Sequence, residues 1–86
     1  MTVHIAVAVR DSAVRAFNRP FIVPTVAVAT RSFVDAVNRK APDNQMFAHP
    51  EDFELWVVGT FDDESGVLAS GEQFCVSRAK DVKDVS

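Results

Sequence analysis

The chain has 86 residues and a mass of 9.4 kDa, which is smaller than most globular domains. It can bury only one small core, and this excludes a multi-domain enzyme with a deep cleft. Hydrophobic residues make up 48% of the chain and charged residues 24%, as in ordinary globular proteins. The single cysteine, Cys75, excludes an internal disulfide and a zinc ribbon, and it is typical of a protein from a reducing compartment.

The net charge of −3 is unevenly distributed. Residues 1–45 carry six basic side chains against three acidic ones, whereas residues 46–86 carry three basic against nine acidic. Such asymmetry is consistent with an anionic partner for the first half, or with a self-complementary surface that joins copies of the chain. It is equally consistent with solvated faces that bind nothing.

Nothing in the hydrophobic pattern predicts a membrane partner. No apolar run approaches the roughly 20 residues that span a bilayer, because arginines interrupt every candidate. The first residues also lack a basic leader followed by an apolar segment, so we expect no secretion.

The chain begins with an alternating segment, Thr2–Val9, in which β-branched residues occupy every second position. This period of two predicts a half-buried strand. A polar turn at 10–12 follows, and Val14–Phe21 is predicted to return as an antiparallel strand. Because proline cannot donate to a central ladder, the two prolines within 19–24 predict a sheet edge or an extended connector there.

The segment 25–40 fits two periodicities, since its first residues alternate like a strand while its apolar residues also recur every three or four positions. Its length favours an amphipathic helix. Thr25 is the expected N-cap, and Pro42 prevents the helix from continuing. Asp35 and Arg39 form a favourable i, i+4 pair on its exposed side.

The second half predicts a hairpin. Phe53–Phe61 alternates as a strand, with Phe53, Leu55, Val57 and Phe61 expected to face the core. The polar run 62–66 then predicts a turn with Gly66 in the left-handed region, leading back into Val67–Ala69. A short last strand is expected at Gln73–Ser77.

The order strand, strand, helix, strand, strand predicts an α+β fold. We expect a small antiparallel sheet of three to four strands with one packed helix. Residues 1–78 are predicted to form this single domain, and residues 79–86, half of which are charged, are predicted to be a flexible tail.

Residues with catalytic or metal-binding chemistry are sparse. His4 and His49, even with Glu51 and Asp52, lack the spacing of a helical metal site, and Cys75 has no nearby histidine. The three glycines form no phosphate-binding loop. We therefore expect no enzyme, no metal and no cofactor.

One stretch favours nucleic acid. An extended backbone at 15–21 would place arginines and phenylalanines on one face, and single-stranded nucleic acid requires cations for phosphate and rings for stacking. The predicted DNA-binding residues are Arg15, Phe17, Arg19, Arg31 and Arg39. In the alternative interpretation the phenylalanines belong to the core, and the arginines are merely solvated or pair with the acidic second half of the chain. The pI of 5.2 counts against tight nonspecific binding.

Three runs in the second half carry a family resemblance: His49–Trp56, Gly59–Asp63 and Ser65–Gly66. Together with Pro20–Phe21, Pro24–Thr25, Arg31, Phe33 and Ala36–Asn38, they resemble a small non-structural protein of gokushovirus-type microviruses, which are bacteriophages with single-stranded DNA genomes. The resemblance covers roughly residues 3–68. Trp56 stands where this family would have tyrosine, and the chain after Ala69 does not align.

The resemblance implies a non-enzymatic viral protein in the cytoplasm of the infected bacterial host. Members of that family are described as DNA-binding, or as acting in the switch from duplex replication to single-stranded genome synthesis and packaging. The first hypothesis is accordingly an accessory protein that binds single-stranded DNA. The second is an interaction module that forms a homo-oligomer or docks on a viral or host protein.

Overall fold

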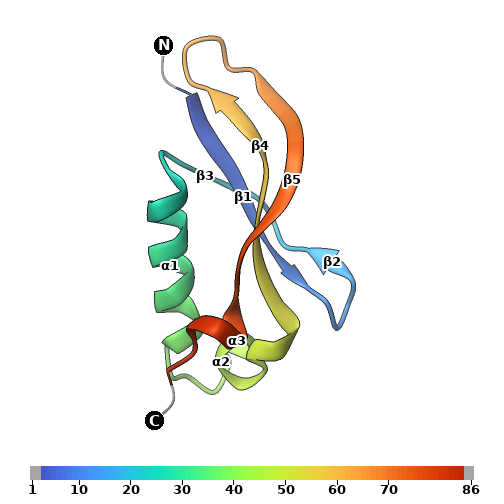
Figure 1. Cartoon of the computed structure of the whole chain (residues 1–86), viewed down its shortest axis with the longest axis vertical. Helices are drawn as coiled ribbons and strands as arrows, with labels where there is room; N and C mark the ends of the chain where they lie inside the picture. The colour runs from blue at the N-terminus through green and yellow to red at the C-terminus, as the bar shows by residue number, and fades with distance from the viewer. Residues whose placement is uncertain (1–2, 85–86) are drawn as a thin grey trace.

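The computed structural model describes residues 3–84, and it consists of a twisted antiparallel sheet with helices against one face (Figure 1). Five strands lie in the sheet in the order β2-β1-β4-β5, with β3 also paired to β1. The elements are β1 (Val3–Asp11), β2 (Ala16–Phe17), β3 (Phe21–Val23), α1 (Val26–Asn38), α2 (Gln45–Ala48), η1 (Pro50–Asp52), β4 (Phe53–Asp62), β5 (Leu68–Arg78) and α3 (Ala79–Val82). The predicted α+β class with an antiparallel sheet is confirmed, with five strands in place of three to four.

The centre of the sheet is the antiparallel pair β1 and β4. The two strands pair along their whole length, from Val3 opposite Asp62 to Asp11 opposite Phe53. The predicted first strand therefore continues past Val9, while Thr2 lies outside the described residues. Alternate apolar residues of both strands face α1, as their period of two predicts.

Helix α1 covers this pair through three buried residues, Ala29, Phe33 and Val37. They pack with core residues of the sheet, among them the fully buried Val7 and Leu55. Their spacing of four places them on one side of a helix, so the choice of helix over strand for this segment is confirmed.

The ends of α1 lie close to the predicted positions. Thr25 is the N-cap, and its Oγ1 accepts a hydrogen bond from the backbone N–H of Val28 at 3.2 Å. Arg39 is the C-cap and pairs with Asp43 at 3.9 Å, rather than with Asp35 as expected. Both acidic groups are four residues from Arg39, but Asp43 lies beyond the helix end, where the arginine side chain reaches it.

Thr25→Ala should lower the free energy of unfolding by about 1 kcal/mol, because it leaves an N–H of the first turn without its side-chain acceptor. Urea denaturation followed by circular dichroism measures the loss. Thr25→Ser, which keeps the hydroxyl, should remain within about 0.5 kcal/mol of the wild type. An equal loss in both variants would contradict the capping role.

The predicted second strand, Val14–Phe21, is wrong. Arg15 has a φ of 58°, which ends any extended run at that position. The chain then forms two short strands that pair with different parts of β1, β2 opposite Arg10 and Asp11 and β3 opposite residues 5–7. Pro20 lies in the irregular segment between them, where no ladder hydrogen bond is needed.

The hairpin of β4 and β5 turns at Gly66, whose φ of 76° confirms the predicted left-handed glycine. Its N–H donates to the carbonyl oxygen of Asp62 at 2.8 Å. Strand β5 is continuous from Leu68 to Arg78, whereas two separate short strands were expected. The pairing skips residues 71–73 and Val58, so β5 bows away from β4 there.

The irregular pairing reverses one predicted side-chain direction. Phe53, Leu55 and Val57 are buried as expected, but Phe61 is only half-buried. Because the register with β1 shifts by one residue at Val58, Phe61 pairs with His4 and lies on the face away from α1. Its prediction as a core residue is wrong for this reason.

The end of the chain differs from the expected tail of residues 79–86. Ala79 is fully buried and begins α3, whose Val82 packs against the core. The Asn38 side chain on α1 holds this segment, donating from Nδ2 to the carbonyl oxygen of Val82 at 2.9 Å and accepting from the N–H of Asp84 at 2.7 Å. Residues 85 and 86 lie outside the described part of the chain.

Among residues 3–84, none of the helices combines the length and the apolar character that crossing a bilayer requires.

Candidate nucleic-acid interface

One face of the sheet packs on α1, and none of the helices within residues 3–84 lies on the opposite face (Figure 1). The pairing of the strands arranges the outward side chains of this helix-free face in four rows. The rows are Phe17, Arg10, Glu54 and Arg78; then Ala8, Trp56 and Cys75; then Ile22, Ala6, Gly59 and Ser70; and finally His4, Phe61 and Leu68. The first row lies next to the β1–β2 turn and the last next to the β4–β5 turn, at opposite ends of the sheet (Figure 1).

An aromatic and cationic group, formed by Arg10, Phe17 and Trp56, lies in the first two rows. The rings of Phe17 and Trp56 meet edge to face, with centroids 5.9 Å apart and planes at 82°. The Arg10 guanidinium carbon lies 6.0 Å from the centroid of the Phe17 ring. Phe17 is 41% exposed, so part of its ring remains open to a ligand.

Three strands, β1, β2 and β4, position this group. Phe17 is directly opposite Arg10 in the β1–β2 pair, and Trp56 is opposite Ala8, one row along the same face. The small Ala8 side chain leaves room for the indole beside Phe17. The geometry therefore presents a cation and an accessible ring next to each other, the combination that stacks on bases and contacts phosphates.

Glu54 moderates the charge at this end of the face. One of its oxygens accepts from the Trp56 Nε1–H at 3.2 Å, and the other lies 3.5 Å from the Arg78 Nε. Glu54 thus fixes the indole and offsets the charge of Arg78. This leaves the arginines of the β1–β2 hairpin as the main positive charge near Phe17.

The structure does not place the arginines and phenylalanines of residues 15–21 on one face of a single extended strand, as predicted. Arg15 lies in the turn, with left-handed backbone, and an irregular segment separates Phe17 from Arg19. All three side chains are nevertheless exposed on the same short hairpin and its exit. The hairpin brings them together by chain proximity rather than by a shared strand face.

Arg31 and Arg39 lie elsewhere. Both are exposed on α1 or at its C-cap, and α1 lies on the opposite side of the β1–β4 pair from β2 (Figure 1). The structure therefore divides the five predicted residues into two sets. Arg15, Phe17 and Arg19 lie together at the hairpin, whereas the two helix arginines, Arg31 and Arg39, lie apart from them.

Sequence reasoning missed Arg10 and Trp56. Arg10 was assigned to a turn, whereas β1 continues through it to Asp11. Trp56 was placed correctly on the outward side of its strand, but only the pairing of β1 with β2 and β4 places it beside Phe17. The available signal was an outward-facing tryptophan in a strand whose other face is apolar.

A family model described as Phage ORF5 protein matches residues 4–82. The chain belongs to the Phage ORF5 protein family. It is therefore a bacteriophage protein, as the resemblance implied. The match also extends beyond the expected end of similarity near residue 68, through β5 and α3. Comparison with curated proteins and with solved structures gave no match.

In this Phage ORF5 protein, the histidines have structural contacts. His4 Nε2 lies 3.0 Å from Asp63 Oδ2, and its ring is tilted against Phe61. His49, Glu51 and Asp52 bring three ligand-type atoms within 4.8 Å of one another. His49 Nδ1 lies 3.7 Å from a Glu51 carboxylate oxygen, both side chains are exposed, and we assign no metal to this group.

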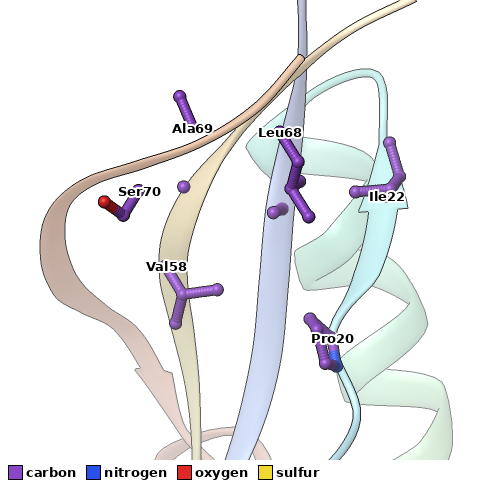
Figure 2. A pocket seen from close by; sticks show the side chains of 8 residues that line it. Pro20, Ile22, Val58, Leu68, Ala69 and Ser70 are labelled. Atoms are coloured by element: carbon purple, nitrogen blue, oxygen red, sulfur yellow. The ribbon is translucent and has the colours of Figure 1, made fainter. Parts of the chain in front are cut away.

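The Phage ORF5 protein also has an apolar groove of about 530 Å³ in the middle of the helix-free face. Pro20, Ile22, Val58 and Leu68 contribute its larger side chains, which Figure 2 shows converging in front of the sheet with α1 behind it. Ile22 is 43% exposed and Leu68 65% exposed. The groove lies between the aromatic group and the β4–β5 turn.

Proposed function

We propose that this protein is a non-enzymatic accessory protein of a gokushovirus-type microvirus that binds single-stranded DNA in the cytoplasm of its bacterial host. It would assist genome synthesis or packaging. The observation that carries the proposal is the exposed Phe17 ring with the Arg10 guanidinium 6.0 Å from its centroid, on a hairpin that also displays Arg15 and Arg19.

The physical argument concerns unpaired bases. A single strand exposes base faces that stack on aromatic rings, each stack contributing about 1–3 kcal/mol, while its phosphates attract arginines. The Phe17 and Trp56 rings meet at 82° rather than stacking in parallel, and Phe17 remains 41% exposed, so part of its ring is accessible to a base. A base on Phe17 would have the arginines of the hairpin within reach of its flanking phosphates.

The proposal predicts salt-dependent binding of a single-stranded oligonucleotide, measured by fluorescence anisotropy over a series of salt concentrations. Arg15→Ala with Arg19→Ala should weaken binding and reduce the slope of log affinity against log salt by about 1.4, since each lost phosphate contact contributes about 0.7 for single strands. Phe17→Leu should weaken binding with little change of slope, because it removes stacking and no charge.

The two helix arginines, Arg31 and Arg39, supply a matched control. Arg31→Ala with Arg39→Ala removes the same charge from the opposite side of the sheet and should leave affinity nearly unchanged. Absence of salt-sensitive binding at micromolar protein would overturn the proposed function. Equal losses in the two double variants would show that the effect is one of net charge and not of the hairpin.

The apolar groove favours a second candidate function, an interaction module that docks on protein. Ile22 and Leu68 are large and exposed and line the same groove, and such patches are typical of protein interfaces.

A further inference from the structure

The helix-free face has an apolar middle that its own chain leaves open. The side chains of Ile22 and Leu68 are 43% and 65% exposed, and they line one groove with Pro20 and Val58 (Figure 2). In a protein of this size, a contiguous apolar surface of this kind is most stable when a second surface covers it.

The charges at the two ends of this face are opposite in sign. At one end, the β1–β2 hairpin and its exit carry Arg10, Arg15 and Arg19 against Asp11. At the other end, the β4–β5 turn contains Asp62, Asp63 and Glu64 in succession. The two turns lie at opposite ends of the sheet (Figure 1). The apolar groove lies between them, because Ile22 and Gly59, which line it, pair with Ala6 in the middle of β1.

We propose that the occupant of this face is a second copy of the same chain, packed in a two-fold symmetric dimer with the strands of the two copies running in opposite directions. A symmetric dimer joins the same patch on both partners. In this orientation the groove meets the groove, and the basic hairpin of each copy lies over the acidic turn of the other. The alternative face-to-face dimer, with strands in the same direction, would place acidic turn on acidic turn and is disfavoured by like-charge repulsion.

The dimensions of the molecule are sufficient for such an interface. Its extents are 44, 23 and 20 Å, so a face that follows its length can bury the roughly 800 Å² per partner of a standard stable interface. The polar ends and the apolar centre also match the usual distribution of a hydrophobic core within a polar rim.

The free edge of β5 is a poorer site for pairing between copies. Between Ser70 and Phe74 the ladder with β4 is interrupted, and residues 71–73 bow outward. Bulges of this kind twist an edge strand away from a regular ladder and discourage edge-to-edge pairing. The helix-free face is therefore the better surface for a second copy.

The dimer does not depend on the proposed DNA binding. If both occur, they compete, because the acidic turn of the partner covers the arginines that a phosphate would contact. A single-stranded oligonucleotide would then dissociate the dimer, whereas a dimer alone is expected if the chain binds no DNA.

Sedimentation equilibrium of the full chain over a range of concentrations tests the proposal, and we expect a monomer–dimer equilibrium. Leu68→Glu should raise the dimer dissociation constant at least about tenfold, because it would bury a carboxylate in the apolar groove that Leu68 lines. Leu68 is mostly exposed in one copy, so the variant should keep the circular dichroism spectrum of the wild type. Val28→Glu, on α1 and also partly exposed, is the matched control and should leave dimerisation unchanged.

A charge exchange tests the orientation of the two copies. Arg19→Glu and Glu64→Arg should each weaken the dimer, and the double variant, which restores opposite charges at both ends, should dimerise nearly as well as the wild type. A strictly monomeric wild type overturns the proposal. A dimer that Leu68→Glu does not weaken, or a double variant weaker than both single variants, also overturns it.

Discussion

Asn44→Ala should lower the free energy of unfolding by about 3 kcal/mol, the largest loss we expect from a single polar side chain in this protein. Asn44 is only 5% exposed. Its Nδ2 donates to the carbonyl oxygens of Ala36 and Arg39, both at 2.7 Å, and its Oδ1 accepts from the N–H of Met46 at 3.2 Å. One side chain thus forms hydrogen bonds with backbone groups at the end of α1 and at the start of α2.

The cost arises because alanine removes the side-chain partner of the Arg39 carbonyl oxygen and of the Met46 N–H, while the Ala36 carbonyl oxygen keeps only the 3.4 Å hydrogen bond from the Arg39 N–H. An unsatisfied buried polar group costs about 1–3 kcal/mol. Urea unfolding followed by Trp56 fluorescence measures the difference. Asn18→Ala, an exposed asparagine in the segment between β2 and β3, is the matched control and should change stability by less than about 0.5 kcal/mol. A loss below about 1 kcal/mol for Asn44→Ala would show that water replaces these hydrogen bonds.

Gly59→Ala should destabilise the sheet by about 1–3 kcal/mol, because a Cβ at this position would overlap the backbone carbonyl oxygen of Ala69 in β5. Neither strand can relieve the overlap with a side-chain rotation, so the two backbones must separate. Thermal unfolding followed by circular dichroism should show a lower midpoint. The groove should also change shape, since both residues line it.

Gly71→Ala provides the matched control for this prediction. A Cβ on Gly71 would meet no atom within 4 Å, because the residue lies where β5 bows away from β4. The two substitutions are chemically identical, and only Gly59→Ala should lower the midpoint. Equal effects would mean that the pairing of β4 and β5 is looser than the structure indicates.

The candidate site was predictable only in part, for reasons that particular residues make clear. The sequence drew attention to Phe17 and the arginines around it, because they form a run in which cations alternate with rings. It placed them on one strand face, and the left-handed backbone of Arg15 prevents that arrangement. The partners of Phe17 are far away in sequence, and their proximity follows from strand pairing, which no local pattern encodes.

The same distinction explains the C-terminal segment. Half of residues 79–86 are charged, and this local composition predicts a tail. Ala79 is nevertheless buried, and Asn38, more than forty positions earlier, forms hydrogen bonds with Val82 and Asp84. These contacts exist only once α1 has packed on the sheet, so they could not be inferred from the segment itself.

What the sequence by itself determined were features with a local cause. The period of two in the apolar residues determined the strands β1 and β4. The spacing of apolar residues, together with the N-cap Thr25, determined α1. The need for a positive φ determined that the turn contains Gly66. The tertiary structure alone decided which strands are neighbours, where the register shifts, and hence which side chains share the helix-free face. Those outcomes depend on contacts between residues distant in the chain, because burial and pairing are properties of the whole sheet.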